Sequence, residues 1–377
     1  MTRQPGLNTQ CVHAAHAPDM STGAVVEPIH LSTTFERDAD GSYPRGYRYS
    51  REGTPNRAAL EACVAALEGG IAAVAFASGL AAIMAVLELL RVGDHILAPL
   101  EAYHGTLRQL REHVRERGVA VDFVDFSRPS AVEAAINTRT RMLWVETPAN
   151  PLLSITDLAT VAAIGHEAQA RVVCDNTFAT PVCQHPFDFG ADIVVHSGTK
   201  YLGGHSDVLG GLTVVRGDNA LVERLKSWQS LAGAVLAPFD CWLLRRSIAT
   251  LALRVRAQCR SALAVARFLD THAAIERVYY PGLPQHPGHA IAAAQMPGGF
   301  GAVLSVCIAG GSEAAFDTAS RTRLFRRATS LGGVESLIEH RASIEGPASG
   351  TPHNLLRLSI GVEDSEDLID DLAQALA

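Results

Sequence analysis

The sequence has little that is typical of secreted, zinc-binding or nucleotide-binding proteins. Its seven cysteines are an odd number at wide spacing and form no Cys-x-x-Cys pair, which argues against a disulfide framework or a zinc site. This usage indicates reduced thiols in a cytoplasmic protein. Neither a G-x-G-x-x-G fingerprint nor a Walker sequence occurs, so any phosphate site would not be of the usual nucleotide type. The first ten residues, MTRQPGLNTQ, are polar and lack the apolar core of a signal peptide.

An excess of basic residues is also missing. The formal net charge of the 377 residues is −7, which argues against a nucleic-acid-binding surface. The hydrophobic content of 47% and the charged content of 19% are ordinary for a globular protein, and the length allows more than one domain. We expect no metal site at His286 and His289, because no acidic residue or cysteine lies near them in the sequence.

One stretch, residues 70–90, has the length of a membrane span. It is rich in alanine, however, and carries Ser78-Gly79 in its middle and Glu88 near its end. We therefore expect a strand at residues 72–77, a tight turn and a helix from Leu80, and no contact with a membrane. The free N–H groups at such a helix start suit a phosphate, although taken alone the stretch is better explained as a buried strand and helix without a ligand.

Residues 90–215 alternate between apolar runs and helix-like segments. Strands are expected at residues 95–99, 120–125, 142–146, 172–175, 193–196 and 212–215, and helices at residues 105–117, 129–137 and 157–169. This alternation predicts an α/β fold with a large, mostly parallel sheet.

Polar residues follow three of these expected strands. Glu146 precedes Asn150, Asp175 is followed by Thr177, and Ser197-Gly-Thr-Lys200 ends a third strand. Ligands of open parallel sheets bind beyond the carboxyl ends of the strands, so we expect a binding site there.

The character of the sequence changes near residue 240. A long helix is expected from about residue 239 to 270, followed by a Pro/Gly-rich loop and the strand-like FGAVLSVCI. We expect a smaller C-terminal α/β domain at residues 251–377, and a larger domain at residues 51–250. Residues 1–50 have few regular signals and are expected to form an arm that embraces a partner subunit.

The lysine of this strand-end cluster suggests a specific chemistry. A lysine beside hydroxyl groups can clamp a phosphate or act as a covalent nucleophile. Together with an acid on a neighbouring strand, here Asp175, it meets the requirement of pyridoxal 5′-phosphate (PLP), which needs a Schiff-base amine and an acidic partner for its pyridinium nitrogen. Tyr103 follows another strand and could stack on the pyridine ring.

The chain resembles the Cys/Met-metabolism family of PLP-dependent enzymes over nearly its whole length. The lysine signature is DIVVHSGTKYLGGHS, and similar segments occur in the family's order: YRYSREGTPN, ALEGG, ASGLAA, ETPANPLL, VVCDNTFATP, SLGGVESLIEH and LLRLSIGVEDSEDLIDDL. The resemblance implies the fold-type I, aspartate-aminotransferase-like architecture, with residues 51–250 as the PLP-binding domain. It also implies an amino-acid substrate and a homotetramer built as a dimer of active-site dimers.

The resemblance also implies a role for individual residues. Lys200 would form the Schiff base with the cofactor and then move protons on the substrate, with Tyr103 as the second catalytic residue. The cofactor site would comprise Ser78, Gly79, Leu80, Tyr103, Asn150, Asp175, Thr177, Ser197, Thr199 and Lys200, with Tyr49 and Arg51 reaching in from a neighbouring subunit. The substrate would contact Arg357, which grips its carboxylate, together with Ser330, Asn150, Arg48 and Thr329.

The sequence departs from the family pattern in three places. The family's Gly-Asn-Pro-Thr is Gly53-Thr-Pro-Asn56 here, and the segment after His340 reads RASIEGPASGTPHN instead of the family's PASMTH. Positions that are commonly acidic in the cystathionine γ-enzymes are Arg48 and Thr329. These changes concern the far end of the substrate pocket and leave the cofactor residues intact.

The reaction itself stays open at this point. The resemblance favours transsulfuration: γ-replacement on O-acyl-homoserine, as in cystathionine γ-synthase, or γ-elimination of cystathionine. The alternatives are a methionine γ-lyase or cystathionine β-lyase type of C–S lyase, a transaminase or decarboxylase of the same fold, and a catalytically silent scaffold.

Overall fold

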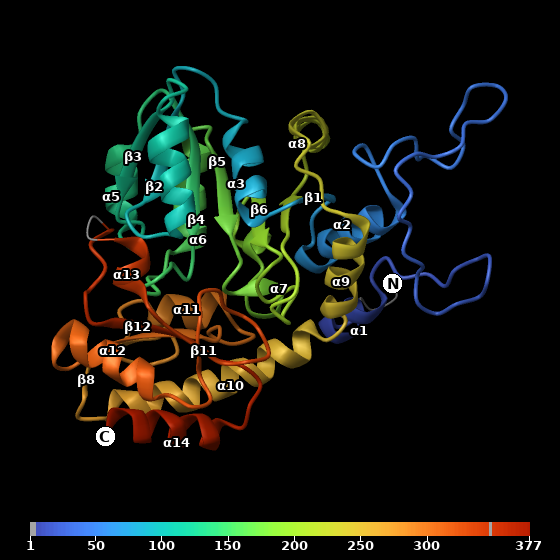
Figure 1. Cartoon of the computed structure of the whole chain (residues 1–377). Coiled ribbons are helices and arrows are strands. Elements are labelled where there is room, and N and C mark those ends of the chain that lie inside the picture. The colour runs from blue at the N-terminus through green and yellow to red at the C-terminus, as the bar shows by residue number, and fades with distance from the viewer. Residues whose placement is uncertain (1–4, 347–348) are drawn as a thin grey trace.

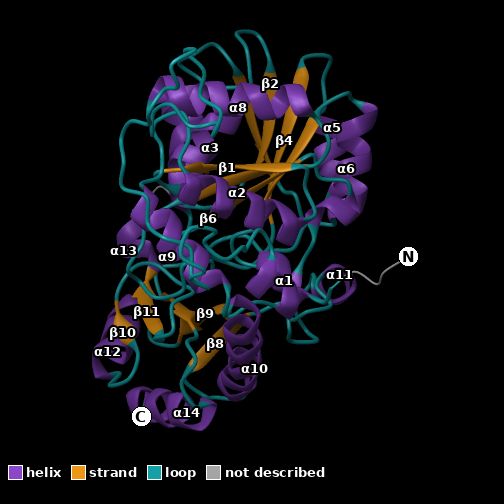
Figure 2. Ribbon diagram, turned by 90° about the vertical axis from the view of Figure 1, so that its right-hand side faces the viewer, coloured by secondary structure: helices purple, strands orange, loops and turns teal. Residues whose placement is uncertain are grey.

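The computed structural model describes residues 5–346 and 349–377, and its centre is a seven-stranded sheet (Figures 1 and 2). The strand order is β1-β7-β6-β5-β4-β2-β3. The strands are β1 (Ala72–Phe76), β2 (His95–Pro99), β3 (Ala120–Val124), β4 (Thr140–Glu146), β5 (Arg171–Asp175), β6 (Ile193–Ser197) and β7 (Gly211–Val215).

All pairings from β6 to β3 are parallel, whereas β7 runs antiparallel to both of its neighbours. The carboxyl ends of β2, β4, β5 and β6 therefore meet at one edge of the sheet. The predicted α/β fold with a large, mostly parallel sheet is confirmed.

The sheet separates two apolar cores because successive side chains of a strand point to opposite faces. In β4, Leu143 and Val145 pack into one core, while Met142 and Trp144 pack into the other. Helices α3 (Gly79–Leu87) and α8 (Asn219–Ala232) cover the second core, and α2 (Pro55–Glu68), α6 (Leu158–Glu167) and α9 (Pro238–Ile248) cover the first. The remaining helices of this part are α4 (His104–Arg108), which continues as a π-helical segment (Gln109–Val114), α5 (Pro129–Ala135) and α7 (Thr180–Cys183).

A second sheet of five strands lies below the first in Figure 1 and has the order β10-β11-β12-β9-β8. Its strands are β8 (Ile275–Tyr279), β9 (Val303–Ile308), β10 (Arg326–Arg327), β11 (Leu337–His340) and β12 (Leu355–Ser359). The helices around it are α10 (Leu251–Asp270), α11 (His289–Gln295), α12 (Gly311–Arg321), α13 (Arg341–Glu345) and α14 (Ser365–Leu376).

The long helix expected at residues 239–270 is two helices, α9 and α10. Between them the hydroxyl group of Thr250 donates to the carbonyl oxygen of Ser247 at 3.2 Å and accepts from Nε of Arg254 at 3.2 Å. A threonine side chain that bonds to the backbone in this way competes with helix continuation. The break coincides with the domain boundary predicted between residues 250 and 251, which stays a prediction.

The N-terminal segment contains α1 (Leu7–His13), which packs against α2 and α10. From there to residue 54, the described chain has no further helix or strand except an isolated bridge between Thr34 and Tyr49. Its loops extend away from the body of the protein, as the blue segments of Figure 1 show. Residues 70–90 form β1 and α3, and none of the described helices has both the length and the apolar character of a membrane span.

Candidate active site

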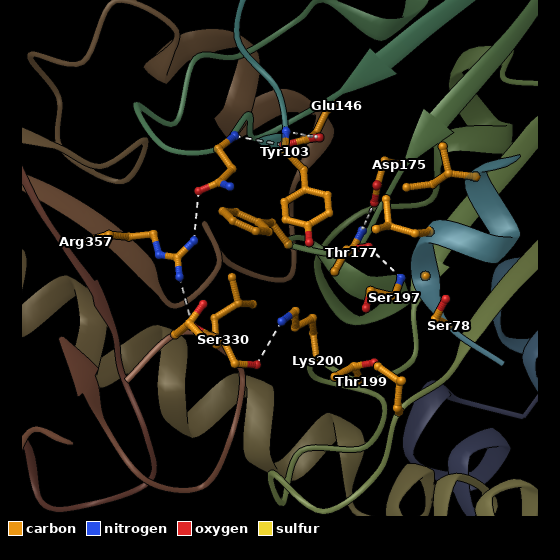
Figure 3. Close-up of a pocket in the computed structure, with 18 of the residues that line it drawn as sticks. Ser78, Tyr103, Glu146, Asp175, Thr177, Ser197, Thr199, Lys200, Ser330 and Arg357 are labelled. Carbon is orange, nitrogen blue, oxygen red and sulfur yellow. Dashed lines mark hydrogen bonds between the residues drawn. The ribbon is translucent and has the colours of Figure 1, made fainter. Parts of the chain in front are cut away.

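A cavity of about 190 Å³ lies where the carboxyl edge of the large sheet faces the second sheet (Figure 3). Thirteen of the predicted site residues line it: Ser78, Gly79, Leu80, Tyr103, Asn150, Asp175, Thr177, Ser197, Thr199, Lys200, Thr329, Ser330 and Arg357. The motif segments that lie far apart in the sequence therefore converge on one site.

Lys200 follows β6 and points into this cavity from the carboxyl edge of the large sheet (Figure 3). Its Nζ donates a hydrogen bond to Oγ of Ser330 at 2.8 Å. Burial, and next the positive charge of Arg357, lower the pKa of the Lys200 amine to about 8. Ser330 itself has a φ of 92°, which is unfavourable for a residue with a side chain and is the kind of backbone strain found at functional sites.

Two buried carboxyl groups line the opposite side of the cavity. Asp175 ends β5 and accepts the backbone N–H of Thr177 at 3.0 Å, and it forms no salt bridge with any described residue. Burial raises the pKa of the Asp175 carboxyl group. A buried acid without a cationic partner fits the role of holding a protonated pyridine nitrogen.

Glu146, at the end of β4, has a different task. Its carboxyl group accepts the backbone N–H groups of Tyr103, at 2.9 and 3.0 Å, and of Asn150, at 2.9 Å. Burial, and next the nearby Asp175, raise its pKa well above the ordinary value. Glu146 therefore fastens the two loops that carry Tyr103 and Asn150.

The start of α3 forms a tightly packed cradle for an anion. The hydroxyl of Ser78 caps the helix by accepting the N–H of Ala81 at 3.1 Å. A Cβ atom at Gly79 would lie 2.9 Å from Cβ of Ser197, and one at Gly211 would collide with the carbonyl oxygen of Ser78. Only glycines allow these close approaches, and the start of α3, with Ser78, Gly79 and Leu80, lines the cavity, where a helix N-terminus suits an anion.

Arg357, on β12, forms the end of the cavity that faces the second sheet. Its Nη1 donates to Oδ1 of Asn150 at 3.0 Å, and its Nη2 donates to the carbonyl oxygen of Ser330 at 3.0 Å and to Oε2 of Glu339 at 2.8 Å. Burial lowers its pKa to about 10, so the guanidinium remains charged near neutral pH.

Three predicted site residues do not line the cavity of their own chain. Arg48 forms an exposed ion pair with Glu52, Arg51 donates to the carbonyl oxygen of Ser230 at 3.0 Å, and Tyr49 is 41% exposed. Their expected positions in a neighbouring subunit's site remain a prediction.

Sequence reasoning missed one charged residue of the cavity and the task of another. Glu146 was expected at the binding site as an acid at a strand end, but no pattern indicated that it binds backbone N–H groups. Arg341 lines the cavity and belongs to the segment after His340 that departs from the family pattern. That departure was the only available signal.

Comparisons with known proteins agree with this geometry. A family model described as "Cys/Met metabolism PLP-dependent enzyme" matches residues 8–377. The chain is 49% identical to the cystathionine gamma-synthase of Mycobacterium tuberculosis and 46% identical to the cystathionine beta-lyase of Coxiella burnetii, in each case over 98% of this chain and 97% of the relative. The crystal structure of cystathionine gamma synthase from Xanthomonas oryzae pv. oryzae in complex with aminoacrylate and cysteine is 42% identical, with a TM-score of 0.95 over 99% of this chain and 98% of that one.

The residues of the cavity and the family model point to the same cofactor. The lysine, the buried acid and the glycine-lined helix start would provide an amine, a partner for a pyridine nitrogen and a place for an anion. The chain therefore belongs to the family of Cys/Met metabolism PLP-dependent enzymes, it is a transsulfuration enzyme, and pyridoxal 5′-phosphate is its cofactor.

Proposed function

We propose that this enzyme catalyses a γ-replacement on an O-acyl-homoserine, or the related γ-elimination of cystathionine. The observation that carries the proposal is the convergence of two groups on Ser330. Its Oγ accepts from Nζ of Lys200 at 2.8 Å, and its carbonyl oxygen accepts from Nη2 of Arg357 at 3.0 Å. A carboxylate held by Arg357 thus has its α-carbon within reach of the Lys200 amine.

The chain's own residues then perform three tasks. Arg357 and Asn150 bind and orient the carboxylate of the amino-acid substrate. When bound, pyridoxal 5′-phosphate would supply an electron sink for the substrate, and Tyr103 would cover its ring while Asp175 would hold its pyridine nitrogen protonated. Lys200 moves protons at the substrate's α- and β-carbons, and its lowered pKa lets it accept and return a proton near neutral pH.

A C–S lyase is the second candidate, either of the cystathionine β-lyase or of the methionine γ-lyase type. The 46% identity to the Coxiella burnetii cystathionine beta-lyase supports it. Thr329 argues against the cystathionine β-lyase type, and equally favours γ-replacement over γ-elimination of cystathionine in our proposal, because it lines the cavity at a position where an acid would attract the distal ammonium group of cystathionine.

Parallel assays distinguish these reactions. The purified enzyme should be given O-acyl-homoserine with cysteine, cystathionine alone and methionine alone, and the products should be identified by mass spectrometry. We expect the highest kcat/KM for formation of a thioether from O-acyl-homoserine. A higher kcat/KM for pyruvate release from cystathionine would contradict γ-replacement and favour the β-lyase.

We also propose that the active site is completed by a second copy of the chain, within a homotetramer. The arm exposes several large apolar side chains, which is unusual for a free surface: Met20, Val25, Val26 and Leu31. Tyr49 and Arg51 would reach the cofactor phosphate of the neighbouring subunit. We further propose a cytoplasmic location, which the seven buried, unpaired cysteines support.

A further inference from the structure

Arg357 is the first member of a buried row of alternating charges, which we call the charge row: Arg357, Glu339, Arg341 and Glu345. The side chains of all four are between 3% and 6% exposed. Oε2 of Glu339 accepts from both neighbours, from Nη2 of Arg357 at 2.8 Å and from Nη1 of Arg341 at 2.6 Å. Arg341 in turn donates from Nη2 and, at 3.2 Å, from Nε to Oε1 of Glu345.

The fold fixes the order of this row. Strands β11 and β12 are antiparallel, and their register places Glu339 directly opposite Arg357. Arg341 and Glu345 are one helical turn apart at the two ends of α13, which suits an ion pair. The row therefore runs from the substrate end of the cavity into the segment that departs from the family pattern.

The two cations and the last acid face different cavities. Arg357 and Arg341 line the active-site cavity, whereas Glu345 lines a neighbouring cavity of about 350 Å³, and Asn150 is shared by both. Glu339 lies behind the two arginines and lines neither. An anion that enters the active site thus meets two positive groups first.

Arg357 alone would be a poor anchor for a carboxylate. Its pair with Glu339 is neutral overall, and in a dry site the negative charge of Glu339 would repel an arriving carboxylate over a short distance. Oε1 of Glu339 has no hydrogen-bond partner among the described residues, so nothing on that side reduces its charge. Arg341, which also donates to Oε2 of Glu339, offsets this negative charge.

We propose that Arg341 is a positioning residue of the substrate-carboxylate site. Its charge neutralises Glu339, so that Arg357 presents a net positive charge to the substrate, and Glu345 holds Arg341 in place from the neighbouring cavity. The proposal rests on the proposed function in one respect, because it takes Arg357 as the carboxylate anchor. After burial and Arg357, the positive charge of Arg341 also contributes to the lowered pKa of Lys200.

Binding of butyrate to the holoenzyme tests the proposal, because butyrate has a carboxylate but no amine that could react. Its dissociation constant should be measured by calorimetry for wild type, for Arg341→Met with Glu345→Gln, for Glu345→Gln alone and for Arg357→Met. The double variant removes the cation without leaving an unpaired acid at Glu345. Arg321→Met with Asp317→Asn is the matched control, since it removes an exposed i,i+4 pair in α12.

We expect the double variant to weaken butyrate binding about tenfold or more, because a buried charge is removed close to the ligand. In Glu345→Gln, which keeps the cation, and in the control pair, the dissociation constant should change by less than about threefold. The KM for the amino-acid substrate should follow the butyrate result while kcat changes little.

Near-normal butyrate binding by the double variant, together with lost binding by Arg357→Met, would refute the role of Arg341 and leave the anchor intact. If Arg357→Met also binds butyrate normally, the anchor assumed in the proposed function is wrong as well. Should the double variant not fold, Arg341→Lys replaces it: this variant keeps the charge, so binding as weak as in Arg357→Met would overturn the proposal.

Discussion

Lys200 is one of two lysines in the chain, and the other, Lys226, lies on α8 with about half of its side chain exposed. We expect Lys200→Ala to lose turnover completely and to bind the cofactor, if at all, without a covalent link to protein. Reduction with borohydride followed by mass spectrometry of the denatured chain measures that link directly. Lys226→Ala is the control and should retain both the link and the activity; near-normal turnover in Lys200→Ala would disprove the assignment.

The lowered pKa of Lys200 has a measurable consequence in the apoenzyme. Because only the neutral amine is nucleophilic, the rate of covalent cofactor attachment should rise with pH and level off above about pH 8. An ordinary lysine, with a pKa of about 10.4, would keep gaining rate up to about pH 10. Between about pH 8 and pH 10, Lys200 binds fewer protons in the folded chain than in the unfolded chain. Lys200 therefore makes the free energy of unfolding rise with pH over this range. Stopped-flow absorbance over this range is the measurement, and a rate still rising above pH 9 would contradict the burial argument.

Thr329 and Arg48 should limit the use of cystathionine. An acid at either position would attract the distal ammonium of cystathionine, whereas Arg48 would repel it. We therefore expect O-acyl-homoserines or short uncharged thioethers to have a higher kcat/KM than cystathionine in wild type. The double variant Arg48→Glu, Thr329→Glu should shift this preference toward cystathionine. Wild type that already cleaves cystathionine best, with no gain in the variant, would show that the pocket argument is wrong.

The residues of the cofactor site were predictable because each lies in a short segment that carries its own signal. Lys200 and Asp175 each follow an apolar run that ends at the same edge of a parallel sheet. The contact between Arg357 and Glu339 was not predictable, because it depends on the register of two strands joined by an irregular segment. Local patterns reveal which residues end a strand, whereas long-range pairing decides what they touch.

At the scale of elements, the contact between β7 and the start of α3 decides how closely the backbone packs at the place where we propose that the cofactor phosphate binds. A methyl group at Gly211 would collide with the backbone of Ser78, whereas one at Gly217, just beyond the other end of β7, has nothing within 4 Å. We expect Gly211→Ala to lower the free energy of unfolding by about 1–3 kcal/mol and to weaken cofactor binding. Gly217→Ala should change neither. Thermal unfolding and cofactor titration of the two apoenzymes provide the measurement, and equal behaviour of the two variants would exclude a tight cradle.

Strand positions were predicted more accurately than helices or strand directions. The run HILAP matches β2 at both ends. The antiparallel direction of β7 was not predicted, since a buried strand has the same composition in either direction. The break at Ala249 and Thr250 was missed because its cause is side-chain hydrogen bonding to the backbone, which helical periodicity does not reveal.

At the scale of the whole molecule, the position of the arm predicts active sites shared between subunits. Arg51→Ala removes the arm's contribution to the neighbouring subunit's site, and Lys200→Ala removes the lysine of its own subunit's site. A hybrid dimer of the two variants would contain one site in which both Arg51 and Lys200 are intact. We expect activity to return when the two inactive proteins are dissociated and reassembled together. Lys200→Ala with Asp175→Asn is the control, because both residues belong to the same chain's cavity and no hybrid site escapes both defects. Absence of recovery in demonstrated Arg51 hybrids would indicate that each site is built from a single chain.

The cavity joins residues from two separate parts of the chain. The residues proposed to hold the cofactor within one subunit lie between Ser78 and Lys200. The last fifty or so residues of the chain contribute Thr329, Ser330, Arg341 and Arg357. Mutations can therefore change the two parts of the chain independently. Substitutions or recombination in the C-terminal part would change which amino acid is accepted while the cofactor machinery stays untouched, so that a new substrate preference can evolve without passing through an inactive ancestor.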